Sequence, residues 1–180
     1  MRVILIIAFV VAFGGLAQAD QIIWHKGSVV LSNKEVVVGD IARQGFDLLL
    51  LRDAKGSVDV LAAHEVSTFR YYDTKENVNR TFFSIANRYY ERVVSGRISV
   101  FRIQKMFHEE IDEKHSEAFD FFIEEGKTIY SISSFRKKFF DKIRDELELQ
   151  LISYKQFDPN TRHGAVSLIL LYNKASVPVI

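Results

Sequence analysis

The feature that most constrains the fold is a succession of short β-rich stretches between Trp24 and Ile132, separated by turn-forming residues at intervals of roughly ten residues. The apolar run Leu48–Leu51 ends at Asp53–Gly56, and the stretch that follows alternates apolar and polar residues. Alternation is typical of strands that bury one face, and closely spaced turns join neighbouring strands into hairpins. The pattern therefore predicts an antiparallel meander that curls into a β-roll or a distorted barrel.

Beyond residue 132 the apolar period lengthens from two residues to four. The residues that carry this period are Phe135, Phe139, Ile143, Leu147 and Leu151. Charged residues fill the intervening positions, which predicts an amphipathic helix from about Ser134 to Ile152 that packs its apolar stripe on the sheet. Val166–Tyr172 is apolar and forms either a last short helix or a strand. The expected fold class is α+β: a β-roll or distorted barrel, then a C-terminal amphipathic helix and a short terminal element.

The start of the chain has the composition of a secretory leader. Arg2 supplies a positive charge, and Val3–Leu16 is apolar but too short to span a bilayer as a helix. Ala17-Gln18-Ala19 matches a signal-peptidase site, with Asp20 as the first mature residue. We expect a signal peptide over 1–19, a β-rich domain over 20–132 and a C-terminal helical segment over 133–180. The mature protein is then secreted or periplasmic.

Composition excludes several classes of function. The chain contains no cysteine, so it carries no disulfide, thiolate metal site or cysteine nucleophile, and burial of its 15 Phe and 7 Tyr must stabilise the fold. Removal of Arg2 with the leader lowers the 24 basic residues to the number of acidic residues, 23. A neutral chain is not expected to bind nucleic acid, and no stable membrane insertion is expected after signal cleavage. We expect no cofactor, and the oligomeric state stays open.

Two motifs approach known chemistries without completing them. His108–Asp112 begins like the zinc-protease helix His-Glu-x-x-His, but an Asp stands where the second His is needed. Gly126-Lys127-Thr128 is similar to the end of a phosphate-binding loop, yet Phe121 occupies the position of its first Gly. We therefore expect no metal site, a solvated charged segment over His108–Glu117, and a tight hairpin turn at Gly126.

Hydrolytic chemistry has no sequence signature here. No Gly-x-Ser-x-Gly elbow is present, and no catalytic residue is assigned. His64 lies beside Glu65 at the entrance to a strand, where a histidine is usually a polar surface residue. A serine triad or a pair of carboxylates is defined by geometry, not by order in the chain. A hydrolase that uses dispersed carboxylates or His64 therefore stays as an alternative.

Two tyrosine pairs flanked by arginine are the best candidates for binding. Neighbouring residues of a strand point to opposite faces, so one Tyr of each pair is expected in the core and the other at the surface. Exposed Tyr with Arg is favoured in interfaces, whereas cross-strand aromatic packing is the structural alternative. The candidate binding residues are Arg70, Tyr71, Tyr72, Tyr89, Tyr90 and Arg92.

A family resemblance rests on the strand pattern. The stretches that carry it are Gly27–Leu31, Val36–Ile41, Val66–Asp73, Tyr90–Arg102, Phe135–Phe139 and Leu171–Asn173. In pattern they resemble uncharacterised exported proteins common in Bacteroidota. The resemblance implies a small exported or envelope-associated β-rich protein with a helical tail, and it implies no activity, cofactor or functional residues.

Together these features favour an exported, non-catalytic module that binds a protein or glycan partner at the cell envelope. One alternative is the hydrolase described above. Another is a structural envelope protein whose exposed β edge pairs with copies of itself or with other proteins.

Overall fold

The structure is a computed structural model that describes residues 22–104, 119–126 and 128–176. Within these residues one antiparallel sheet of 10 strands precedes the helices, which confirms the α+β fold class. The helices are α2 (Phe135–Lys138), α3 (Phe140–Leu149) and α4 (Arg162–Ala175).

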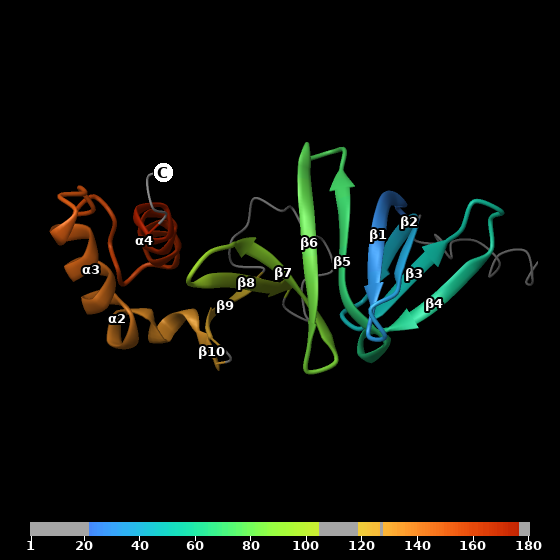
Figure 1. Cartoon of the computed structure of the whole chain (residues 1–180), viewed down its shortest axis with the longest axis horizontal. Coiled ribbons are helices and arrows are strands. Elements are labelled where there is room, and N and C mark those ends of the chain that lie inside the picture. Colours follow the sequence, from blue (N-terminus) through green and yellow to red (C-terminus); the bar gives the residue numbers. More distant parts are fainter. Residues whose placement is uncertain (1–21, 105–118, 127, 177–180) are drawn as a thin grey trace, which may run out of the picture.

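The strands follow one another along the chain and form a single open sheet. They are β1 (His25–Leu31), β2 (Val36–Gln44), β3 (Leu48–Arg52), β4 (Val58–Ala62), β5 (Val66–Asp73), β6 (Val78–Ile85), β7 (Arg88–Val94), β8 (Ser99–Gln104), β9 (Phe119–Glu125) and β10 (Thr128–Ser131). Their order in space is β10-β9-β8-β7-β6-β5-β1-β2-β3-β4. The helices lie at one end of the long axis of the molecule and β1 to β4 lie toward the other (Figure 1). The sheet does not close, so the fold is not a barrel.

The half of the sheet that contains β1 to β4 curls over its own face and encloses a first core. The amide of Tyr89, near the start of β7, donates to the carbonyl of Phe46 between β2 and β3 at 2.8 Å. Gly27 allows β1 to approach β5, because a Cβ there would lie 2.3 Å from the carbonyl oxygen of Arg70. The first core consists of Val29, Ile41, Leu49, Leu51, Ala63, Val66, Phe69, Phe82 and Tyr89. We call the sheet face that carries this core the inner face and the opposite one the outer face.

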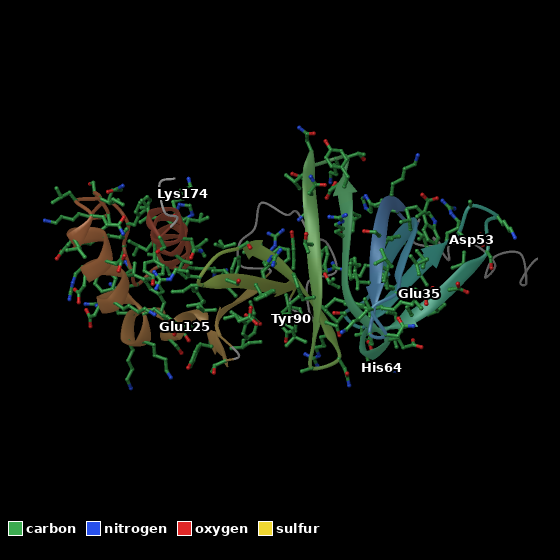
Figure 2. The ribbon with its side chains drawn as sticks, viewed as in Figure 1. Glu35, Asp53, His64, Tyr90, Glu125 and Lys174 are labelled. Carbon is green, nitrogen blue, oxygen red and sulfur yellow. The ribbon has the colours of Figure 1, made fainter. Side chains whose placement is uncertain are left out.

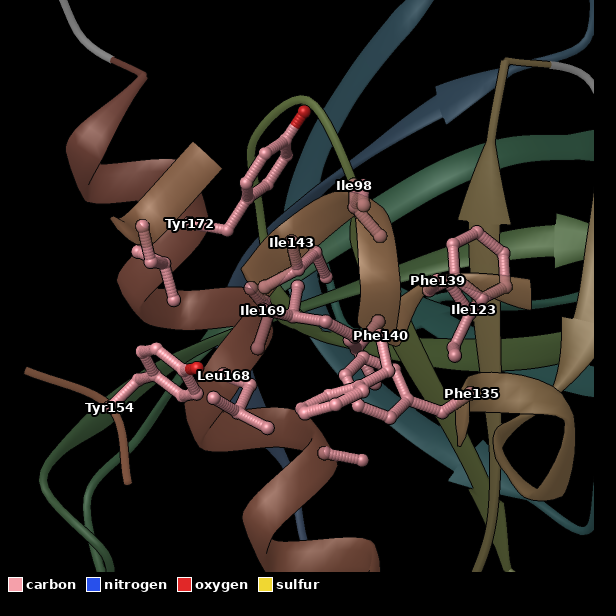
Figure 3. Close-up of a cluster of buried hydrophobic side chains, with 14 residues drawn as sticks. Ile98, Ile123, Phe135, Phe139, Phe140, Ile143, Tyr154, Leu168, Ile169 and Tyr172 are labelled. Carbon is pink, nitrogen blue, oxygen red and sulfur yellow. The ribbon is translucent and has the colours of Figure 1, made fainter. Parts of the chain in front are cut away.

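The helices enclose a second core with strands β7 to β9 (Figure 3). Its strand residues include Val100 and Ile123, which are paired neighbours on β8 and β9. Ile143 of α3 and Leu168 of α4 are fully buried against this region. The apolar stripe of the C-terminal segment thus packs on the sheet, as its four-residue period predicts.

The helix predicted over 134–152 differs in detail from the helices observed. It is divided at Phe139 into α2 and α3, and α3 ends at Leu149. Leu151 is 93% exposed, so its predicted place in the buried stripe is wrong. The reason is local: Leu151 has a φ of +57°, and the next amide, of Ile152, donates back to the carbonyl of Leu147 at 2.9 Å. This is the Schellman end of a helix, which turns the chain away from the helix axis.

Val166–Tyr172, which the sequence predicts as either a helix or a strand, is helical and belongs to α4. Its first turn is capped by Thr161, whose hydroxyl oxygen accepts the amide of Gly164 at 3.0 Å. Near its other end, Asn173 binds the backbone of Ile98 twice, accepting the amide at 3.1 Å and donating to the carbonyl at 2.8 Å. These bonds attach α4 to the end of the β7–β8 hairpin. Among the described residues, no helix combines the length and the apolar character that crossing a membrane would require.

Candidate functional site

One row of cross-strand neighbours on the inner face sets the position of the site. From β5 to β9 the row reads Phe69, Phe82, Glu91, Arg102 and Phe121. Phe69 and Phe82 belong to the first core, and Phe121 packs against the second core. Two charged residues therefore stand between two apolar regions. Charged groups in such a place need partners, because burying an unpaired charge is costly.

The partners are supplied by a set of alternating charges, Asp73, Arg80, Glu91 and Arg102, which we call the ion chain. Arg80 donates from Nε to an oxygen of Asp73 at 2.8 Å and from a terminal nitrogen to Glu91 at 2.9 Å. Nε of Arg102 donates to the other oxygen of Glu91 at 2.7 Å. Both carboxylates of the ion chain are thus engaged by arginine.

Asp73 is ionised at neutral pH despite its burial. Burial alone raises the pKa of this carboxyl, but the hydrogen bond and charge of Arg80 and two backbone amides outweigh it, so the pKa is lowered. The amides belong to Lys75 and Glu76, and they donate to the second oxygen of Asp73 at 3.0 and 3.2 Å. Asp73 is therefore unsuited to donate a proton in a general-acid step at neutral pH.

Two adjoining hollows open beside the ion chain. Both are lined by Ile23, His25, Arg43 and Tyr71, and we call the two together the inner hollow. The larger part has a volume of about 610 Å³. The smaller part, of about 210 Å³, reaches the ion chain. The larger volume lies within the range of about 300–1,000 Å³ that small-molecule sites occupy.

Stacked rings form one side of the inner hollow. The ring centroids of His25 and Tyr71 are 4.4 Å apart with the planes at 22°, and those of Tyr71 and Phe82 are 5.6 Å apart at 14°. The guanidinium carbon of Arg43 lies 5.2 Å from the centroid of the Phe82 ring. Burial raises the pKa of the Tyr71 hydroxyl, which therefore stays protonated and able to donate a hydrogen bond. Because Tyr71 stands between His25 and Phe82, its ring faces are covered, and the stack offers a ligand the polar edge of Tyr71 and the imidazole of His25.

Arg43 is the cation best placed to meet a ligand. Within the described residues it forms no ion pair with a carboxylate, and its contact is with the ring of Phe82. It is accessible to solvent but stands in a concave surface, where desolvation by the surrounding protein lowers its pKa. The guanidinium nevertheless remains charged, because the ordinary pKa of arginine is far above neutral pH.

The charge of the smaller part of the inner hollow is positive overall. Its cationic side chains are those of Arg43, Lys75, Arg80 and Arg102, and its carboxylates are those of Asp73 and Glu91. Because Arg80 and Arg102 are engaged with the two carboxylates, the excess charge belongs to Arg43 and Lys75. The arrangement is suited to binding an anionic group.

The six binding residues predicted from the sequence do not form one site. The alternation of the strands places Tyr71 and Tyr89 on the inner face and Arg70, Tyr72, Tyr90 and Arg92 on the outer face. Tyr71 lines the inner hollow. Tyr89 is 1% exposed in the first core, and its ring packs edge-on against Phe69 at 5.0 Å. The pairs are therefore divided between the two faces, and Tyr89 contributes to packing.

The outer-face arginines border a second open depression, of about 440 Å³. The guanidinium of Arg92 lies 4.7 Å from the ring centroid of Phe83. Arg70 donates from Nε to the hydroxyl of Ser28 at 3.2 Å. Both arginines are thus held by residues of the same face, and neither contact neutralises the charge of its guanidinium.

The two outer-face tyrosines also have neighbours within the described residues. Tyr72 is 42% exposed, and its hydroxyl donates to the side-chain oxygen of Asn77. The ring of Tyr90, on β7 at the middle of the molecule (Figure 2), lies edge-on to Phe122 at 5.5 Å. This cross-strand aromatic packing is the structural alternative that the sequence left open.

The other motifs give no further site. His64 lies in the short turn η1 (Ala63–Glu65), where its backbone carbonyl accepts the hydroxyl of Ser32 at 2.7 Å. Gly126 has a φ of +64°, and β9 and β10 pair on either side of it, which confirms the predicted hairpin. The segment 108–117 lies outside the described residues. Within the residues that the structure describes, no three His, Cys, Asp or Glu side chains gather as metal ligands.

Most of the inner hollow was missed by sequence reasoning. The missed residues are His25, Arg43, Asp73, Arg80, Glu91 and Arg102. A signal for four of them exists: each stands two positions from a buried apolar residue, and so on the inward-facing side of its strand, namely Arg43, Arg80, Glu91 and Arg102. The signal gives the face but not the hollow, because only the curl of the sheet brings β1 and β2 beside the ion chain.

Comparison with known proteins adds no assignment. The chain matches no protein-family model, and no curated protein or solved structure is significantly similar to it. The function must therefore be argued from the geometry of the chain itself.

Proposed function

We propose that this protein is an exported, non-catalytic binding module of the cell envelope, and that the inner hollow holds part of a glycan or protein partner. The observation that carries the proposal is Arg43, a cation without a carboxylate partner among the described residues, beside the stacked rings of His25 and Tyr71. Export is supported by the leader-like composition of 1–19 and by the resemblance to exported proteins of Bacteroidota.

The hydrolase alternative receives less support from the geometry. The described residues that line the inner hollow include two carboxylates, Asp73 and Glu91, and each is engaged by arginine. Glycoside hydrolysis needs one carboxyl with a raised pKa as the acid, whereas the pKa of Asp73 is lowered. Both carboxylates therefore neutralise arginine side chains, and neither is placed to act as a catalytic acid. The geometry favours binding over hydrolysis.

One observation supports the other alternative, a structural envelope protein whose β edge pairs with other strands. Strand β4 is an edge of the sheet, and Val58 and Val60 on it are 45% and 58% exposed. Exposed edges of this kind pair readily with other strands. If oligomer size rose with concentration and Val60→Lys abolished the rise, the structural role would be favoured over a monomeric binder.

The proposal is tested by recovery of partners from envelope extract and from a glycan array. Arg43→Gln should abolish recovery that the native protein shows, because it removes the guanidinium that, among the described residues, has no carboxylate partner. The matched control is Arg70→Gln on the outer face, which should retain recovery. If Tyr72→Ala with Tyr90→Ala abolished recovery while Arg43→Gln did not, the outer face would be the binding surface and the inner hollow would not.

Export and removal of the leader are tested separately, by mass spectrometry. The intact mass of the protein purified from its native host should correspond to a chain that begins at Asp20. Retention of Met1–Ala19 together with a cytosolic location would overturn the envelope part of the proposal.

A further inference from the structure

We infer that the inner hollow binds an acidic sugar unit, with its carboxylate on Arg43 and its ring against the imidazole of His25. The inference rests on the proposed function and narrows the partner from a protein or glycan to a uronic-acid-bearing glycan. Its basis is a guanidinium without a carboxylate partner among the described residues, which lines the same concave volume as the imidazole that ends the aromatic stack.

The charge requirement comes from the ion chain. Glu91 and Asp73 already satisfy Arg80 and Arg102, so a ligand carboxylate has no competitor within the described residues for Arg43. A guanidinium binds a carboxylate by two parallel hydrogen bonds, which fixes direction as well as charge. Lys75, at the rim of the same hollow, adds positive charge without a fixed direction.

The ring requirement comes from the aromatic stack. The C–H bonds of a pyranose ring present a weakly positive apolar face, which an aromatic face attracts. The hydroxyl groups around the ring then need polar partners at the edges. Gln44 and His25 line the larger part of the inner hollow, and the protonated hydroxyl of Tyr71 can donate.

The shape favours a sugar over a folded protein partner. Stable protein interfaces are broad and bury about 800 Å² on each partner. The inner hollow is instead a concave volume of about 610 Å³ with a second volume of about 210 Å³ beside it. A concave volume with a few polar groups is typical of sites for small molecules.

The test is isothermal titration calorimetry of the purified native protein with trigalacturonate and triglucuronate. The neutral probe is galactotriose, and the acidic peptide probe is hexaglutamate. We expect a uronate to bind, galactotriose to bind at least about tenfold more weakly, and hexaglutamate not to bind measurably. Arg43→Gln should weaken uronate binding at least about tenfold, and Arg43→Lys should restore part of the loss because charge returns without the planar fork.

Controls separate binding from folding. His25→Ala is a second variant of the inner hollow and should weaken all sugars, whereas Arg70→Gln on the outer face should change none. Thermal unfolding of each variant shows whether it is folded. Equal binding of uronates and galactotriose, equal or tighter binding of hexaglutamate, or unchanged uronate binding by a folded Arg43→Gln would overturn the inference.

The experiments distinguish a wrong acidic-sugar assignment from a wrong proposed function. If neither uronate bound the native protein, the acidic-sugar assignment would be wrong. The proposed function would still stand if the array or the extract gave a partner that depended on Arg43. If no partner depended on Arg43, both would be wrong.

Discussion

The two halves of the inner face bury their apolar residues in different ways. Beside β8 and β9, the helices α3 and α4 cover the sheet, and Ile143, Leu147 and Leu168 are fully buried there. Beside β1 and β2, the sheet curls over itself and leaves the inner hollow open next to the first core. In the covered half the helices bury the apolar residues of the sheet, whereas the curled half keeps a concave surface that a partner can enter.

The ion chain lies at the border between these halves. Paired charges in a buried place contribute little net stability, because desolvation offsets their attraction. They do fix where charge lies: Arg80 and Arg102 are neutralised, whereas Arg43 has no carboxylate partner in the part of the chain that the structure describes. The covered half thus supplies stability through apolar contact, and the border supplies the charge pattern of the site.

The largest effect is expected at the border. Arg80→Met removes the shared partner of Asp73 and Glu91 and should lower the free energy of unfolding by about 3–5 kcal/mol, because two buried carboxylates lose a cation. Urea unfolding followed by circular dichroism measures it. The matched control is Arg52→Met, which breaks the more exposed pair with Asp40 and should cost about 1 kcal/mol or less. Equal losses in the two variants would show that the ion chain is no more coupled than a surface pair.

The covered half should respond nearly as strongly. Ile143→Ala removes a fully buried side chain between α3 and the sheet and should cost about 2–5 kcal/mol in the free energy of unfolding, through lost burial and a residual cavity. Leu149→Ala, in the same helix but 81% exposed, is the matched control and should cost much less. A small loss for Ile143→Ala would mean that α3 is loosely packed and that the helices do not supply most of the stability.

The smallest effect is expected in the loss of stability at low pH. The folded-state pKa of Asp73 is lowered, so its ionised form stabilises the fold above the ordinary carboxyl range, and this contribution is lost as the pH falls through the folded-state pKa. The native protein should therefore lose more stability than Asp73→Asn as the pH is lowered from about 5 to 2. Urea midpoints at a series of pH values measure the difference. Parallel curves for the two proteins would contradict the ion pairing described here.

Several features of the fold could be predicted from local pattern. Alternation and turn spacing predicted antiparallel strands, and the four-residue period from Phe135 to Leu147 predicted a buried helical stripe. The period failed at Leu151, because a left-handed residue ended the helix before the pattern did. A helix end of this kind depends on a few backbone bonds that apolar spacing does not record.

The candidate site was only partly predictable. The period of two correctly implied that Tyr71 and Tyr72, or Tyr89 and Tyr90, face opposite sides. It could not say which side would be enclosed and which would keep a hollow. That choice depends on where the sheet curls and where the helices return along it.

The short-range properties of this protein follow from its residue pattern alone: the strand alternation, the hairpin at Gly126, the amphipathic helix and the reliance on aromatic and aliphatic burial without cysteine. The meeting of Arg43 from β2 with His25 from β1 and Tyr71 from β5 in one hollow follows only from the folded arrangement of the strands. The two kinds of property differ in the range of the contacts on which they depend. Periodicity reports contacts between residues close in the chain, whereas a curled sheet brings together side chains whose distance in space no local pattern contains.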